Sequence, residues 1–156
     1  MANQIAFIPL RDADTTDLWH LLNDQRVTKH MPLAEKVDLQ WVEQWKTNKS
    51  GLWPTPEMGP WAVMVDGALA GWVGVQPDGE GQSEFAIVLN VWAWGLGGEI
   101  TRRALERWAG FKREDRLVFY LPKSRPIDIV ERRLGFQMIG EGEIAGQTFV
   151  MFALPN

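Results

Sequence analysis

The segment Trp92-Ala-Trp-Gly-Leu-Gly-Gly-Glu-Ile100 carries the strongest structural signal in this sequence. It stands where an alternating apolar pattern over residues 84–90 gives way to a helical pattern of period 3.6. Its glycines, Gly95, Gly97 and Gly98, let the backbone approach a ligand closely. The first amides of a helix lack intrahelical acceptors and lie at the positive end of its dipole. The segment therefore predicts an anion-binding turn between a strand and a helix.

Three designs of phosphate-binding loop compete for this turn. A P-loop requires Gly-Lys-Ser/Thr, which the segment lacks. A dinucleotide fingerprint belongs to a βαβ unit near the start of a chain, whereas several predicted strands precede this loop. The remaining design is the loop that binds the pyrophosphate of coenzyme A.

The elements around the loop follow from hydrophobic periodicity. The Asp66-Gly67 pair predicts a hairpin, and Ile100, Ala104 and Trp108 form an apolar stripe on the helix after the loop. We predict strands at 5–10, 61–65, 69–75, 84–90, 117–121, 136–139 and 148–154, and helices after Asp14, Asp38 and Gly98 and from Pro126. This order predicts one α/β domain over residues 1–156, a mixed sheet with helices on its faces. The strand–helix–strand units imply local parallel pairing with right-handed crossovers.

Composition and charge exclude several classes of protein. The net charge of −4 disfavours a nucleic-acid partner. No apolar run approaches the ~18 residues that a membrane span needs, and the first ten residues lack the features of a signal peptide. We therefore expect a cytoplasmic protein with no membrane partner.

Metal and nucleophile chemistry are also disfavoured. The chain has no cysteine, and its two histidines, His20 and His30, lack the HExxH context of a zinc site. A Ser-His-Asp triad would need a GxSxG turn, which is absent. We therefore expect no metal. The nine tryptophans are expected to fill the core and line a cleft. A weaker alternative is that they form an aromatic platform for sugar binding.

At the glycine loop the sequence resembles the GNAT acetyltransferase superfamily. The family loop reads Gln/Arg-x-x-Gly-x-Gly/Ala, and Trp92-Ala-Trp-Gly95-Leu-Gly97 fits it except at the first position. A register that starts two residues later would put Glu99 beside phosphate and turn Arg102 toward the core, so we reject it. The segments Ile8–Pro32 and Arg132–Phe136 are similar to the opening of the ribosomal-protein N-acetyltransferase branch and to the family's C-terminal signature.

The resemblance implies the acyl-CoA N-acyltransferase fold, with about seven strands and four helices. It also implies that acetyl-CoA is the cofactor and that an amine attacks its thioester directly. A main-chain N–H near Val88 or Leu89 would polarise the acyl carbonyl, and Asn90 would hydrogen-bond the pantetheine or cap the strand end. The diphosphate would lie on the main-chain amides of the loop, from Trp94, Gly95, Leu96, Gly97 and Gly98.

Three side chains are candidates for proton transfer. An alkylammonium has a pKa near ~10.4, so a base is needed, and Glu84 is the candidate; it could equally be a solvated strand carboxylate. Ser124 and Tyr120 are candidates to protonate the thiolate product, although Tyr120 could serve only as a strand residue. The family often carries an asparagine after the fifth strand, where this chain has Ser124-Arg-Pro-Ile127.

The acceptor implied is a primary amine, either a protein N-terminus or a small molecule such as a polyamine, an amino acid or an aminoglycoside-like compound. The resemblance also implies a possible homodimer, because the family often dimerises through its C-terminal strands. The alternative function is a non-catalytic acyl-CoA-binding or sensor module, which the departures at Trp92 and Ser124 keep open.

Overall fold

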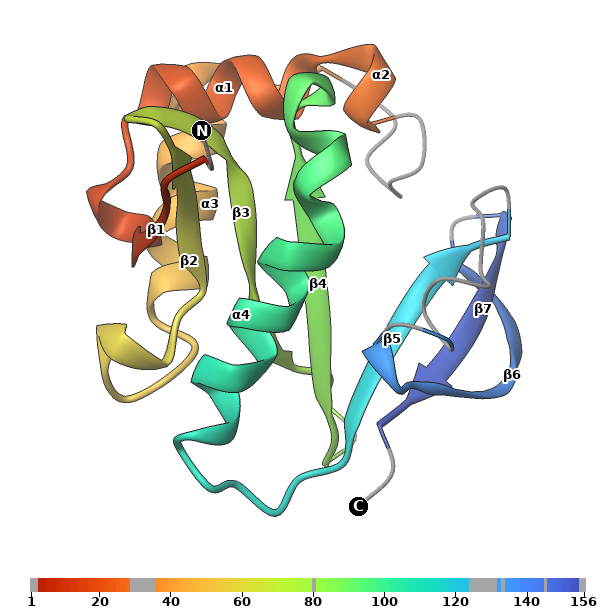
Figure 1. Cartoon of the computed structure of the whole chain (residues 1–156). Helices are drawn as coiled ribbons and strands as arrows, with labels where there is room; N and C mark the ends of the chain where they lie inside the picture. The colour runs from red at the N-terminus through yellow and green to blue at the C-terminus, as the bar shows by residue number, and fades with distance from the viewer. Residues whose placement is uncertain are drawn as a thin grey trace.

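A seven-stranded mixed sheet forms the centre of the molecule (Figure 1). The computed structural model describes residues 3–28, 36–79, 81–123, 132, 134–144 and 146–154. The strands are β1 (Ile5–Pro9), β2 (Trp61–Val65), β3 (Ala68–Pro77), β4 (Ser83–Leu89), β5 (Leu117–Pro122), β6 (Gln137–Ile144) and β7 (Gln147–Ala153). Their order in the sheet is β1-β2-β3-β4-β5-β7-β6. All pairs are antiparallel except β4 and β5, which the helix between them joins in parallel, as the sequence predicts.

Helices cover both faces of the sheet (Figure 1). The helices are α1 (Thr15–Asn23), α2 (Gln25–Thr28), α3 (Leu39–Ser50) and α4 (Gly97–Ala109), with 3-10 turns η1 (Leu10–Asp12), η2 (Pro56–Met58) and η3 (Val91–Leu96). On one face, the predicted stripe of α4 is buried against Phe85 and Leu89 of β4. On the other face, α1 and α3 pack on Trp72 and its neighbours. The seven strands and four helices among the described residues confirm the predicted fold class.

The predicted helix starts at Asp14 and Asp38 are confirmed. The Asp14 carboxylate accepts a hydrogen bond from the Asp17 N–H at 3.0 Å, and the Asp38 carboxylate accepts one from the Trp41 N–H at 2.7 Å. Each bond satisfies an amide that the helix leaves without an acceptor. Leu39, the first residue of α3, is 48% exposed, so the apolar residues at the start of this helix do not all face the core.

Helix α2 was not predicted, because the segment after Asn23 is polar. Its local cause is Asp24, whose carboxylate accepts from the Arg26 N–H at 2.9 Å while its carbonyl accepts from Val27 and Thr28. An aspartate in that position is a helix-start signal even without an apolar stripe. The helix predicted from Pro126 falls largely on residues 124–131, which lie outside the described part of the chain.

Strands β4 and β5 separate after a short paired stretch (Figure 1). Their pairing is limited to Ser83 with Leu117, Glu84 with Val118 and Phe85 with Phe119. Beyond it, β4 continues on β3 alone and β5 continues on β7 alone. The result is an opening within the sheet, bordered by the last residues of β4 and β5.

The close contact of β3 with the end of β4 depends on Gly71. A β carbon at this position would lie 2.0 Å from the Val88 carbonyl oxygen and 2.8 Å from the Leu89 Cα. Because both atoms belong to the backbone, the strands would have to separate. We expect Gly71→Ala to lower the free energy of unfolding by about 3 kcal/mol, measured by urea denaturation. Gly51→Ala is the matched control, because its β carbon would meet no atom closer than 3.7 Å; equal stability of the two variants would contradict the prediction.

Candidate functional site

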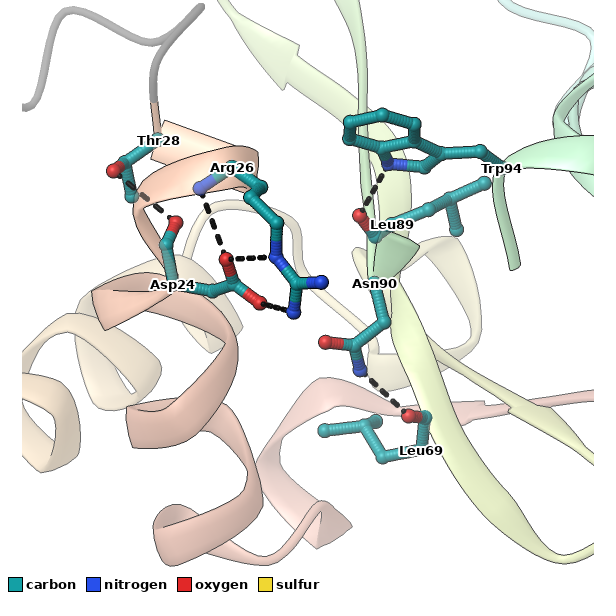
Figure 2. A network of polar contacts seen from close by, with 7 residues as sticks. All are labelled: Asp24, Arg26, Thr28, Leu69, Leu89, Asn90 and Trp94. Atoms are coloured by element: carbon teal, nitrogen blue, oxygen red, sulfur yellow. Dashed lines mark hydrogen bonds and ion pairs between the residues drawn. The ribbon is translucent and has the colours of Figure 1, made fainter. Parts of the chain in front are cut away.

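The turn between β4 and α4 is fastened by two side chains (Figure 2). The indole Nε1 of Trp94 donates to the Leu89 carbonyl at 3.0 Å. The amide Nδ2 of Asn90 donates to the Leu69 carbonyl at 3.0 Å, and the Asn90 main-chain N–H donates to the Ala70 carbonyl at 2.7 Å. Asn90 therefore ties the end of β4 to β3, the second of the two roles expected for it. Trp94 holds the turn through its side chain, a contact that no local sequence pattern predicts.

Helix α4 begins at Gly97, and its cap residue, Leu96, offers no side-chain acceptor. The Gly97 N–H donates to the Trp94 carbonyl, which completes the η3 turn. The next amides, of Gly98 and Glu99, belong to the first turn that an α-helix leaves without intrahelical acceptors. These amides and the helix dipole favour an anion at this end of α4.

The surface outside two of the glycines is open. A β carbon added at Gly95 or Gly98 would meet no atom within 4 Å, whereas one at Gly97 would contact Leu89 at 3.8 Å. The register assigned to the loop places Ile100 and Ala104 on the apolar stripe of α4. Both residues are fully buried, which supports that register. The loop therefore presents its backbone at Gly95 and Gly98 to free space, which fits a diphosphate group.

The pairing of β4 with β3 determines which main-chain amides face the opening. In an antiparallel ladder, alternate residues direct their N–H and C=O to the same neighbouring strand. The Asn90 N–H bonds to β3, so the Val88 amide also faces β3. The amides of Ile87 and Leu89 face the other edge, where the described β5 no longer pairs with β4. Of the two amides expected from the sequence, Leu89 faces the opening and Val88 does not; the Ile87 amide is an addition that follows only once the β3–β4 register is known.

Glu84 lies at the start of β4, on the α3 side of the sheet. Its Oε2 accepts a hydrogen bond from Nε2 of Gln76 on β3 at 3.0 Å. Its Cα lies about 16 Å from that of Leu89 along the strand, at ~3.3 Å per residue. Glu84 and the glycine loop thus mark opposite ends of β4, with the backbone of Ile87 between them.

Tyr120 lies where β5 leaves β4. Its partner on β7 is Met151, and it follows Phe119, the last residue of β5 that pairs with β4. Because side chains alternate along a strand, Tyr120 shares a face with Val118, which is the pairing partner of Glu84. The structure therefore places Tyr120 and Glu84 on the same face at the narrow end of the opening. Ser124 lies outside the described residues.

Glu99 adds a carboxylate to the first turn of α4. It accepts hydrogen bonds from Arg102 at 2.7 Å and from Arg103 at 2.8 Å. These bonds lower the pKa of Glu99 to about 2. Its negative charge is thus offset by two guanidinium groups, which limits its repulsion of an anion at the loop.

Other features of the described chain lie away from this site. One surface hollow borders Phe7 and Arg107, between β1 and α4, and another borders Trp19 and residues 36–40. Neither touches the glycine loop, so the site is located by its backbone geometry. Within the described ranges, no group of His, Asp and Glu side chains is arranged to hold a metal ion, and no helix is long and apolar enough to cross a membrane.

Residues 4–137 match the family model described as acetyltransferase (GNAT) domain. The chain belongs to the GNAT acetyltransferase family. The match includes both strands of the opening, the glycine loop and α4. The GNAT family uses acetyl-CoA, and the open backbone at Gly95 and Gly98 is compatible with it. The sequence matches no protein of curated function.

Solved structures share the GNAT fold over nearly the whole chain. A GnaT-family protein from Bordetella pertussis aligns with a TM-score of 0.75 and 17% identity, over 97% of this chain and 96% of its own. A ribosomal-protein-alanine N-acetyltransferase from Brucella melitensis aligns with a TM-score of 0.69 and 19% identity, over 96% and 98%. A Salmonella typhimurium protein solved with its cofactor acetyl-CoA aligns with a TM-score of 0.70 and 16% identity, over 99% and 94%. At these identities the likeness is one of fold.

Proposed function

We propose that this protein transfers the acetyl group of acetyl-CoA to a primary amine by direct attack of the amine. The observation that carries the proposal is the opening between β4 and β5, with a glycine loop at its wide end and Glu84 at its narrow end. Acetyl-CoA supplies the acetyl group as a thioester, and its long pantetheine arm suits a site whose ends lie this far apart.

The backbone has two roles in this proposal. Amides of the turn and of the first turn of α4, at Gly98 and Glu99, bind the diphosphate. The amides of Ile87 and Leu89 face the opening, and either can donate to the thioester carbonyl oxygen as negative charge develops on it. Donors that are fixed before the reaction stabilise that charge without reorganisation. The Ile87 amide is the nearer of the two to Glu84.

Two side chains move protons in this scheme. Glu84 accepts a proton from the acceptor ammonium, directly or through one water, because the free alkylammonium has a pKa near ~10.4 and is largely protonated at neutral pH. The amine nitrogen then attacks the thioester carbon, so that the C–N bond forms and the C–S bond breaks. Tyr120, on the same face as Glu84, donates its hydroxyl proton to the departing sulfur; Ser124 is the second candidate for this step. The attacking nitrogen loses a second proton, which restores this hydroxyl through water, and Glu84 releases its own proton to solvent.

The acceptor class is a protein N-terminus or a small-molecule amine. The opening segment of the chain is similar to the ribosomal-protein branch, and one structure of similar fold is a ribosomal-protein-alanine N-acetyltransferase. These similarities favour an N-terminal alanine peptide as the first acceptor to test. Polyamines, amino acids and aminoglycosides complete the panel of acceptors.

The proposal is tested by thiol release from acetyl-CoA across this panel of amines, after a thermal-shift titration with acetyl-CoA alone. With a Kd of ~10 μM, acetyl-CoA at ~1 mM should stabilise the fold by about 2.7 kcal/mol. Amine-dependent thiol release would support the transferase. Stabilisation without release by any amine would favour the acyl-CoA-binding module, and no stabilisation at millimolar acetyl-CoA would contradict both.

A further inference from the structure

A chain of three polar side chains crosses the α3 side of the sheet and ends on Glu84. The Lys49 ammonium, in the last turn of α3, donates to Oε1 of Gln76. The other end of the same amide, Nε2, donates to Oε2 of Glu84 at 3.0 Å. Gln76 and Glu84 face each other across the β3–β4 ladder. The chain thus links a helix and two strands.

Hydrogen-bond chemistry fixes the orientation of the Gln76 amide. An ammonium group can only donate, and an ionised carboxylate can only accept. The amide satisfies both neighbours only with its oxygen toward Lys49 and its nitrogen toward Glu84. The ammonium charge therefore polarises the amide in the direction that strengthens its bond to the carboxylate.

Lys49 is itself held in place by aromatic packing. Its Nζ lies 5.3 Å from the centre of the Trp72 ring, within the range of a cation–π contact. Trp72 is only 5% exposed and meets Trp45 of α3 edge to face at 5.6 Å. Partial burial lowers the pKa of Lys49, and the charge of Glu84 opposes that shift.

We infer that Gln76 and Lys49 are positioning residues that hold Oε2 of Glu84, so that its other oxygen is left for the proton of the acceptor ammonium. Within the described residues, Oε1 of Glu84 has no protein hydrogen-bond partner. The inference rests on the proposed role of Glu84 as the base. It adds that the orientation of Glu84 is set from α3 and β3.

The charges around Glu84 predict the direction of the effect. Among the described residues, Lys49 on α3 is the cation that interacts with it, while its strand partners, Gln76 on β3 and Val118 on β5, are uncharged. Removal of the amide donor takes away the contact that holds Oε2, and removal of the cation takes away the group that orients the amide. Both changes should therefore loosen the Glu84 carboxylate.

The experiment records the NMR signal of the Glu84 carboxyl carbon at neutral pH and measures steady-state kinetics in Gln76→Met and Lys49→Met. We expect this signal to move in each variant, because the carboxylate loses its fixed partner, and kcat at neutral pH to fall about tenfold with KM for acetyl-CoA unchanged. Lys49→Arg should restore most of the wild-type behaviour, since it keeps the cation. Gln44→Met and Lys112→Met are matched controls on exposed positions and should change neither quantity.

An unchanged Glu84 carboxyl signal in both variants would overturn the inference, and so would a moved signal with unchanged kcat. If Gln76→Met fails to fold, Gln76→Glu replaces it; this variant keeps the shape, cannot donate to Glu84 when ionised and should also move the carboxyl signal. Recording this signal needs no substrate, so it reports on the network even if the wild-type protein proves to have no transferase activity. A failure of the proposed function would instead appear as absent thiol release in the wild type.

Discussion

Glu84→Gln is expected to lower kcat by about 10²- to 10³-fold at neutral pH while leaving the Kd for acetyl-CoA unchanged. The amide of glutamine has nearly the shape of the carboxylate and can still accept from Gln76, so the cross-strand contact survives. What is lost is the ability to take a proton from the acceptor ammonium. Since acetyl-CoA makes its proposed phosphate contacts at the other end of β4, its binding should not respond.

The pH dependence of kcat in Glu84→Gln is a second test of the proposed base. As the pH approaches the pKa of the acceptor ammonium, ~8 for a peptide N-terminus and ~10.4 for an alkylammonium, more of the acceptor is already deprotonated and a base matters less. The deficit of Glu84→Gln relative to wild type should therefore narrow as the pH rises. Glu143→Gln, on the exposed edge strand β6, is the control. Equal kcat for wild type and Glu84→Gln at neutral pH would show that another group, or water alone, accepts the proton.

Gly95→Val is expected to weaken acetyl-CoA binding at least about 100-fold while the protein stays folded. The β carbon would enter free space, because no atom beyond its own stretch of backbone lies within 4 Å of its position. In the complex that space would hold the diphosphate, and the branched side chain would keep it from the backbone amides. A loss of about 100-fold corresponds to roughly 2.7 kcal/mol.

Calorimetric titration of acetyl-CoA measures this change, with thermal unfolding run in parallel. Gly51→Val, at the end of α3, applies the same substitution at a glycine far along the chain from the loop and should bind like wild type. Retained affinity in a folded Gly95→Val protein would mean that the diphosphate does not approach the loop at this glycine, and the assigned register would be wrong.

Local signals made much of the fold predictable from the sequence. The Asp66-Gly67 turn takes positive φ at both residues, 50° and 84°, as a tight hairpin requires. The apolar stripe of α4 and the two aspartate caps follow from residues within one or two helical turns of each other. Trp61, Trp72 and Trp108 are buried in the core, as predicted. Trp19, Trp45 and Trp53 are partly buried and pack against it. Trp41, Trp92 and Trp94 are exposed.

The features that were missed depend on pairing between distant segments. The separation of β4 from β5 depends on how far the two strands stay paired before β5 is paired with β7 alone. No local pattern encodes that point. The parity that directs the Ile87 amide to the opening follows only once the β3–β4 register is known. With that register, the contact of Gln76 with Glu84 could have been predicted from sequence, because the turn between β3 and β4 is short and places the two side chains opposite each other.

In the proposed complex, acetyl-CoA lies along the opening between β4 and β5 with its diphosphate on the glycine loop. Backbone proton–nitrogen NMR spectra recorded during an acetyl-CoA titration test this placement, because the proposed contacts are main-chain amides. The largest shifts are expected at Gly95–Glu99 and at Ile87 and Leu89, with little change in β1. Saturable shifts confined to other surfaces, or none at millimolar acetyl-CoA, would rule this placement out.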